Sequence, residues 1–295
     1  MQRLVVFFIL LLLMTGFSFA EPWKLSLESS IGLTQNTFSD NWQGGSSGSV
    51  AWSTQFNFQA EKQITPSWHN RNVLKPSFGQ THTQDQESKK WLRPAKSTDQ
   101  IDLETVWRLT KGWVVDPYAS GRLESQFLDQ SDTMKTRSFN PMRLTESIGF
   151  ARTMWKGDNY DWTVKLGTSV RQNIDRDVLN VLTNTRSAKT VRDGGIQIDS
   201  DLKTPLSERL NYTGKLTIFQ AMYNSKSDEL KGLPNENYWR ATDVNWENVI
   251  TGRLSQYIAV SLTVQWLYDK ELDLGGRFKQ TMTLGFSYLM KSEAK

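Results

Sequence analysis

The two histidines are the first residues to consider for catalysis, because histidine is the usual base in enzymes that activate a hydroxyl nucleophile. His69 follows Trp68 beside a short turn, and His82 stands between Thr81 and Thr83 in a polar stretch. His82 is the better placed of the two, yet neither forms a convincing constellation with a nucleophile. The sequence therefore favours a protein that is not an enzyme, and hydrolysis of lipid or acyl chains stays as a weaker alternative.

Metal and cofactor sites have equally little support. Asp129, Asp132, Asp175 and Asp177 lie in polar stretches and could bind calcium through their carboxylates, but they do not follow the spacing of a calcium-binding loop. Gly194-Gly195 lacks the helix and lysine of a phosphate-binding loop. The chain has no cysteine, which excludes disulfides, thiolate metal sites and a lipoprotein anchor. We expect no cofactor.

Charged residues recur at every second position in several stretches. Successive side chains of a strand point to opposite faces, so this spacing places the charges on one face of each strand. We expect that face to line an interior, where the charges either pair and fill the space or tune what passes. The expected lining residues are Asp102, Glu104, Arg108, Asp116, Arg122, Glu124, Lys165, Arg171, Asp199, Asp201, Lys203, Asp243, Glu247 and Arg253.

The elements that position these charges are strands with one apolar and one polar face. The hairpin from Gln256 to Met290 shows the pattern best, since Ile258 and Leu262 alternate with Ser261 and Thr263. The apolar face ends in aromatic residues, as at a membrane interface. This pattern predicts a transmembrane, up-and-down antiparallel β-barrel, with a soluble sandwich as the rival.

Alternation and turn residues predict about twelve strands. They run over Lys24–Thr34, Ser49–Lys62, Trp68–His82, Asp99–Thr110, Trp113–Leu128, Arg143–Trp155, Tyr160–Gln172, Gly194–Thr204, Arg209–Tyr223, Trp239–Leu254, Gln256–Leu272 and Arg277–Lys291. Pro76 and Pro117 fall inside two of them and should mark a bulge or a boundary, because proline removes a ladder hydrogen bond. Glu146 and Arg152 share the apolar face of a third.

The connections alternate between short and long, which is typical of outer-membrane barrels with short periplasmic turns and long extracellular loops. A soluble sandwich has no reason to sort its loops in this way. With the amino terminus in the periplasm, Asp273–Gly276 is the one short connection on the outer side, and six basic residues should face the cell exterior. The long connections are Gln35–Gly48, Thr83–Thr98, Asp129–Met142, Asn173–Asp193 and Asn224–Tyr238, and the six basic residues are Lys89, Lys90, Lys135, Arg186, Lys189 and Lys226.

Aromatic residues gather near the amino terminus and the short connections, where they would form a girdle at one membrane interface. The plainer alternative is that strands are rich in aromatics anyway. The residues concerned are Trp23, Trp68, Trp107, Trp113, Trp155, Tyr160, Trp162, Tyr212 and Tyr257.

The amino terminus resembles an export signal. Arg3 precedes the apolar run Leu4–Met14, and Ser18-Phe19-Ala20 has the small-x-small pattern of a cleavage site before Glu21. We expect residues 1–20 to be removed and residues 21–295 to form one domain in the bacterial outer membrane. The net charge is only +4 and includes no long basic run, which argues against nucleic-acid binding.

Three short stretches resemble a known family. They are Asn41-Trp42 with Gly44-Gly45, Asp243-Val244-Asn245-Trp246-Glu247, and Phe278-Lys279-Gln280 leading into Leu284-Gly285-Phe286-Ser287-Tyr288. Their order and spacing resemble the bacterial outer-membrane family known as domain of unknown function 3078. The resemblance implies an outer-membrane barrel over the mature chain and implies no activity or ligand. Unlike many such barrels, the chain ends in a polar tail, Lys291–Lys295.

The expected function is a narrow channel or a barrel that binds a small solute or lipid, with a surface adhesin or scaffold as a third possibility. The expected partners are outer-membrane lipid, the barrel-assembly machinery, and small solutes or ions, while the oligomeric state stays open. At twelve strands the size of the inward side chains decides whether a lumen remains. We expect an interior that is crowded beside the charged strands and open beside the small inward residues Ala259, Ser261, Thr263, Thr281, Thr283, Gly285 and Ser287.

Overall fold

The computed structural model describes residues 23–36, 47–85, 87–132, 134–157, 160–180 and 183–292, with side chains through residue 286. The expected export signal, the motif residues Asn41-Trp42 and Gly44-Gly45, and the side chains of Ser287 and Tyr288 lie outside these descriptions. None of the helices in the described ranges is long and apolar enough to cross a membrane.

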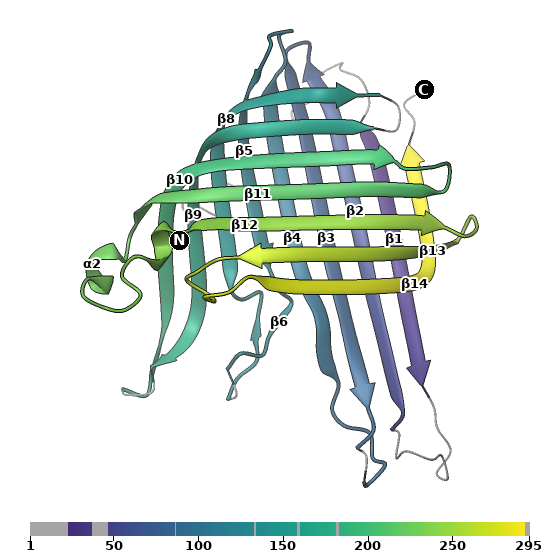
Figure 1. The fold of residues 1–295 in the computed structure, drawn as a ribbon, viewed down its shortest axis with the longest axis vertical. Coiled ribbons are helices and arrows are strands. Elements are labelled where there is room, and N and C mark those ends of the chain that lie inside the picture. Colours follow the sequence, from purple (N-terminus) through teal and green to yellow (C-terminus); the bar gives the residue numbers. More distant parts are fainter. Residues whose placement is uncertain are drawn as a thin grey trace.

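Twelve antiparallel strands form a closed barrel, in which each strand pairs with its neighbours in the chain and β1 pairs with β14 (Figure 1). This confirms the predicted fold class and strand number, and it excludes the soluble sandwich. The barrel strands are β1 (Lys24–Asn36), β2 (Ser49–Thr65), β3 (Trp68–Thr83), β4 (Ala95–Leu109), β5 (Asp116–Ser125), β8 (Met142–Lys156), β9 (Asp161–Asn180), β10 (Thr185–Pro205), β11 (Leu210–Asn224), β12 (Thr242–Arg253), β13 (Ile258–Tyr268) and β14 (Arg277–Ser292).

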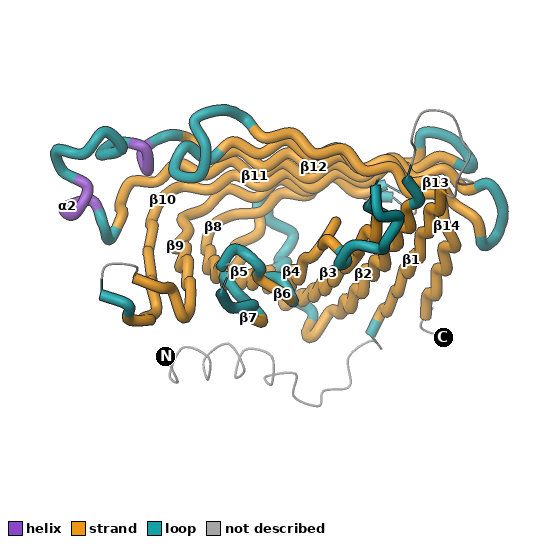
Figure 2. The backbone as a smooth tube through the Cα atoms, turned by 90° about the horizontal axis from the view of Figure 1, so that it is seen from below, coloured by secondary structure: helices purple, strands orange, loops and turns teal. Residues whose placement is uncertain are grey.

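The connections divide between two rims of the barrel. The short-turn rim carries residues 66–67, 110–115, 157–160, 206–209 and 254–257, and the long-loop rim carries the others. On the long-loop rim, residues 126–141 contain the small ribbon β6 (Leu128–Asp129) and β7 (Arg137–Ser138), and residues 225–241 contain α2 (Ser227–Leu230) and η1 (Tyr238–Arg240). Viewed along β1 to β4, the strands β10 to β14 form an opposite wall, so the barrel is flattened (Figure 2).

Two predicted connections were wrong in length. Residues 173–193 are not a long loop, because β9 and β10 continue as a paired hairpin to Asn180 and Thr185. Their polar composition suggested a loop, but contacts from residues 126–141 hold them as strands. The predicted short exception, Asp273–Gly276, belongs to a longer connection of residues 269–276, since β13 ends at Tyr268.

The two prolines occupy different places in their strands. Pro76 lies inside β3 opposite Ile101, and the ladder between β2 and β3 lacks pairs from 56 to 57 without changing register. Pro117 is the second residue of β5, so the predicted start at Trp113 was too early. In both cases the missing N–H is tolerated where the ladder is interrupted or begins.

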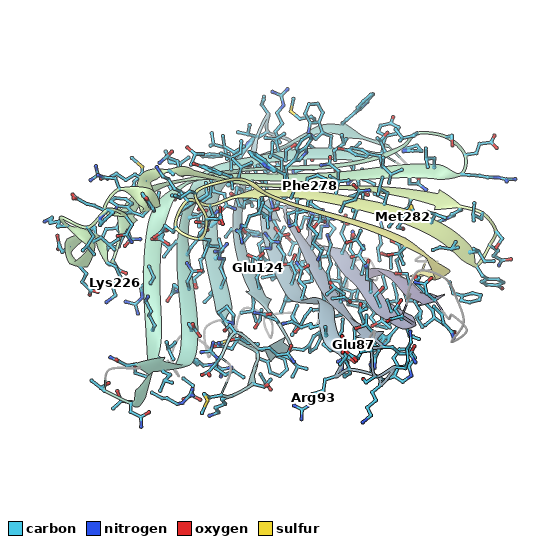
Figure 3. The ribbon with its side chains drawn as sticks, turned by 60° about the horizontal axis from the view of Figure 1, so that its bottom comes forward. Glu87, Arg93, Glu124, Lys226, Phe278 and Met282 are labelled. Carbon is cyan, nitrogen blue, oxygen red and sulfur yellow. The ribbon has the colours of Figure 1, made fainter. Side chains whose placement is uncertain are left out.

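The barrel is apolar outside and polar inside. Six hydrophobic residues are buried among those described, against seventeen buried polar or charged residues. Large apolar side chains on the outer face stay exposed, such as Phe278 and Met282 on β14, whereas Glu124 lies between the two walls (Figure 3). The girdle residues Trp113 and Trp155 are also exposed and lie at the short-turn rim. A water-soluble protein has the opposite arrangement.

Candidate functional site

The interior contains a cavity of about 690 Å³. One wall, formed by β13, β14, β1 and β2, contributes mainly short hydroxyl and amide side chains, beside the charged Glu28, Arg277 and Lys279. The short side chains are Ser30, Ser53, Gln55, Asn57, Ser261, Thr263, Thr281 and Thr283. The expected small residues Ala259 and Gly285 share the inward face through their pairing but do not border the cavity. Short side chains leave room beside this wall.

The opposite side of the interior holds a cluster of paired charges around Glu104. Its carboxylate accepts from Lys165 Nζ at 2.9 Å and from Lys215 Nζ at 3.1 Å. Lys165 is 4 % exposed and also lies within 4 Å of Asp199 and Asp201. The contact joins β4 to β9 and β11, which are not neighbours in the sheet, so these side chains cross the interior beside the cavity.

A second pairing lies next to this cluster. Arg122 donates two hydrogen bonds to Asp102, from Nε at 2.8 Å and from Nη2 at 2.9 Å, and its Nη2 lies 3.1 Å from Glu124. A bidentate arginine–carboxylate pair fixes both side chains in one geometry. This pairing makes the β4–β5 side of the interior rigid as well as crowded.

A third group lies nearer the long-loop rim. The Arg171 guanidinium stacks on the ring of Phe219 at 3.5 Å from its centroid and donates to Asp243 at 2.8 Å. Phe219 packs in turn against Ala221 and Trp239, so residues 225–241 are anchored on the inward face of β11.

The fourteen residues expected to line the interior fall into three groups. Eight of them border the cavity, four form ion pairs outside its lining, and two are exposed near the short-turn rim. The first group is Asp102, Glu104, Arg122, Glu124, Arg171, Asp199, Asp243 and Glu247. The second is Lys165, Asp201, Arg108 and Asp116, and the third is Lys203 and Arg253.

Several cavity residues were not identified from the sequence. Alternation carried the signal in each case, because each stands two residues from another side chain that borders the cavity. In the part of the chain that the structure describes, seven basic and eight acidic residues border the cavity, so the lining is nearly balanced. The residues that were missed are Glu28, Lys75, Arg143, Lys215, Asp269, Arg277 and Lys279.

The histidines lie apart from the cavity. His69 Nε2 is 3.0 Å from Glu61 on the neighbouring strand, and His82 pairs with Val50 at the long-loop rim. Ser46 stands in a G-x-S-x-G sequence, a motif that acts at a strand-to-helix turn. Here β2 starts at Ser49 and no helix follows. No group of three or more potential metal ligands occurs within the described ranges.

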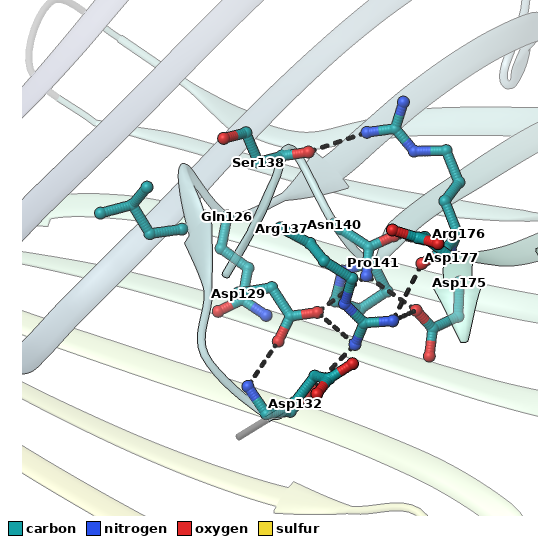
Figure 4. Close-up of polar contacts among 12 residues, drawn as sticks. Gln126, Asp129, Asp132, Arg137, Ser138, Asn140, Pro141, Asp175, Arg176 and Asp177 are labelled. Atoms are coloured by element: carbon teal, nitrogen blue, oxygen red, sulfur yellow. Dashed lines mark hydrogen bonds and ion pairs between the residues drawn. The ribbon is translucent and has the colours of Figure 1, made fainter. Parts of the chain in front are cut away.

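The loop aspartates that could have bound calcium are instead paired with basic residues (Figure 4). Arg137 is buried between Asp129 at 2.6 Å and Asp175 at 2.9 Å. Asn140 is fully buried and donates to the same two carboxylates at 2.7 Å. These contacts attach residues 126–141, the docked loop, to the extended part of β9. The docked loop is a fixed part of the long-loop rim.

Two further carboxyls at this contact have a lowered pKa. The Met134 N–H and then Arg186 hydrogen-bond to Asp132 and hold its pKa below the usual 3.8. Lys135 lowers the pKa of Asp177 in the same way. A lowered folded pKa stabilises the docked loop above the ordinary carboxyl pKa, and this stabilisation is lost as the pH falls through the lowered value.

We therefore expect the docked loop to detach in acid, at a pH below the ordinary carboxyl pKa. The chain lacks cysteine, so a spin label on Met134→Cys reports this loop alone. Its spectrum should change to that of a mobile label on acidification and return to that of an immobile label at pH 7. Adding Arg137→Gln should make it mobile already at pH 7, whereas a label on Ser207→Cys in a short turn should not respond. An immobile label at pH 2.5 would show that these ion pairs do not hold the loop.

Comparison with protein families agrees with part of the resemblance. The family described as "Protein of unknown function (DUF3078)" matches residues 33–130. This match confirms the resemblance over that region, which includes Asn41-Trp42 and Gly44-Gly45. The two stretches that begin at Asp243 and Phe278 lie beyond it. No curated protein matches the chain.

Solved structures with a similar shape are outer-membrane proteins. The COG4313 outer membrane channel from Pseudomonas putida F1 is 11% identical with a TM-score of 0.46, covering 94% of this chain and 99% of that one. The translocator domain of the autotransporter NalP from Neisseria meningitidis is 10% identical with a TM-score of 0.39, covering 97% and 94%. Likeness at this level identifies no function for this chain.

Proposed function

We propose that the protein is an outer-membrane barrel that forms a narrow, water-filled passage for ions or one small hydrophilic solute. The observation that carries this proposal is the inverted barrel, whose exposed apolar outer face encloses a polar cavity of about 690 Å³. Lipid cannot satisfy an open sheet edge, so a closed barrel is the form in which strands cross a membrane. Export through a cleaved signal, with the long-loop rim outside the cell, belongs to the same proposal.

The passage should follow the wall of short side chains. The Glu104 cluster and the Arg122 pairing occupy the other side of the interior, and their charges are largely compensated. Because acids and bases are nearly equal in number around the cavity, we expect weak ion selectivity.

Planar-bilayer recordings of the purified protein test this proposal. The wild type should give small conductance steps with weak selectivity. Glu104→Ala and Arg122→Ala should each change the step size, because each removes a side chain that narrows the passage and leaves its partners free to move. A barrel that is silent as wild type and in both variants would rule out the channel.

A surface scaffold is the second candidate, and the docked loop favours it. Arg137 and Asn140 fix that loop on the extended β9–β10 hairpin, which gives the long-loop rim a rigid outer structure. If the barrel conducts no current in planar bilayers, the scaffold function remains. Hydrolysis of lipid or acyl chains has no comparable support, since neither histidine adjoins the cavity; loss of such an activity in His82→Ala, with the barrel intact, would favour it.

A further inference from the structure

Glu28 places a negative charge on the cavity wall, and no basic residue in the described ranges forms an ion pair with it. Glu28 on β1 lies directly opposite Asn57 on β2, and both border the cavity. The Asn57 Oδ1 atom is buried and has no hydrogen-bond partner. Neither the Glu28 carboxylate nor this amide oxygen accepts a hydrogen bond from another residue in the described ranges.

The other acids of the interior differ from Glu28 in their neighbours. Glu104, Asp102 and Asp243 each have a lysine or arginine partner within 3.1 Å. Glu247 has no such ion pair, but Lys215 is its cross-strand neighbour on β11. The cross-strand neighbours of Glu28 are Asn57 and Leu289, neither of which is basic.

A carboxylate in a confined polar space is costly unless an opposite charge accompanies it. The amide oxygen of Asn57 adds an acceptor and no positive charge, so the neutralising group has to come from the solution in the cavity. Opposed side chains on neighbouring strands have Cβ atoms about 5 Å apart, so once the Asn57 amide rotates toward the cavity, its oxygen and the Glu28 carboxylate can contact one small cation. Ser30 and Gln55, the next opposed pair on this face, supply further oxygen atoms.

We propose that Glu28 and Asn57 form a binding step for small monovalent cations in the passage, either an inorganic ion or the ammonium group of a small amine. The proposal deepens the channel function and rests on it. Both ligands suit a carboxylate that has no basic partner on the wall of a polar cavity, because an alkali cation takes oxygen ligands and an ammonium group donates several N–H bonds. The weak selectivity of the passage is therefore for cations, and this pair sets it.

Reversal potentials in a potassium chloride gradient test the proposal. The wild type should prefer cations, and Glu28→Gln should lower the cation-to-anion permeability ratio roughly three- to five-fold, the size expected for one unit charge near the path of an ion in water. Asn57→Asp should raise the ratio instead, an opposite change that a merely structural role would not produce.

Glu146→Gln is the matched control. Glu146 lies on β8 opposite Gly121 and Val170, on the face that points away from the cavity. The same chemical change there should leave the ratio unchanged. Replacing potassium by methylammonium separates the two ligands: a reduced current that Glu28→Gln restores identifies the ammonium group, and an equal current identifies the inorganic ion. An unchanged ratio in Glu28→Gln would overturn the proposal and leave the channel standing.

A barrel that conducts no current would contradict the channel instead. Equilibrium dialysis of the detergent-solubilised full protein against radioactive rubidium and methylammonium then decides the cation site separately. Binding that Glu28→Gln abolishes and Glu146→Gln preserves supports the site, and binding that is absent or equal in the two variants overturns it.

Discussion

Replacing Gly167 by valine should prevent the barrel from closing. Gly167 on β9 lies opposite Gly149 on β8, and the backbones approach so closely that a Cβ atom on Gly167 would lie 2.3 Å from the Ile148 carbonyl oxygen. It would also lie 2.7 Å from the Tyr118 hydroxyl. The obstacle on one side is backbone, so the two strands have to separate. Where inward side chains converge on a strongly curved wall, only glycine leaves the strands their spacing.

The expected result is loss of the folded species for Gly167→Val and a milder defect of about 1–3 kcal/mol for Gly167→Ala. Gel mobility of unboiled and boiled samples measures the first, and thermal unfolding in detergent measures the second. Gly252→Ala in β12 is the matched control, because the nearest atom to its Cβ would be Leu210 Cδ1 at an ordinary 3.5 Å. It should fold and melt like the wild type. Equal melting of Gly167→Val would show that β8 and β9 do not approach in this way.

Replacing Glu104 by alanine should destabilise the barrel by about 3–5 kcal/mol, the usual effect of leaving a buried charge without its partner. Lys165 and Lys215 would then lie close together without the carboxylate between them. Asp199 and Asp201, at 3.9 and 3.7 Å from Lys165, would compensate its charge in part. Chemical unfolding in detergent, followed by tryptophan fluorescence, measures the change.

Glu124→Ala is the control for this prediction. Glu124 is more exposed than Glu104, and its partner Arg122 keeps the bidentate bond to Asp102, so we expect a loss below about 1 kcal/mol. Glu104→Ala with Lys215→Met should recover part of the stability, because one of the two unpaired cations is removed as well. Equal losses for Glu104→Ala and Glu124→Ala would show that the cluster around Glu104 does not hold the interior together.

The sequence by itself determined the barrel. Alternation of apolar and polar residues has a period of two, which is a local property of each strand, so it predicted twelve strands and an inward face for fourteen of the charged residues. The length of the connections predicted the two rims. Alternation and connection length can both be read without knowing which residues lie across the interior.

The tertiary structure decided which inward residues meet. Glu104 contacts Lys165 and Lys215, which are 61 and 111 residues away in the sequence, and alternation gives no distance between strands that are not neighbours in the sheet. The same reason applies to the extended β9–β10 hairpin, whose polar sequence resembles a loop until Arg137 and Asn140 dock on it. It applies to Glu28 as well, which stands out only once every other charge has been placed. Flattening and register bring some walls into contact and leave others apart, and these are properties of the whole barrel.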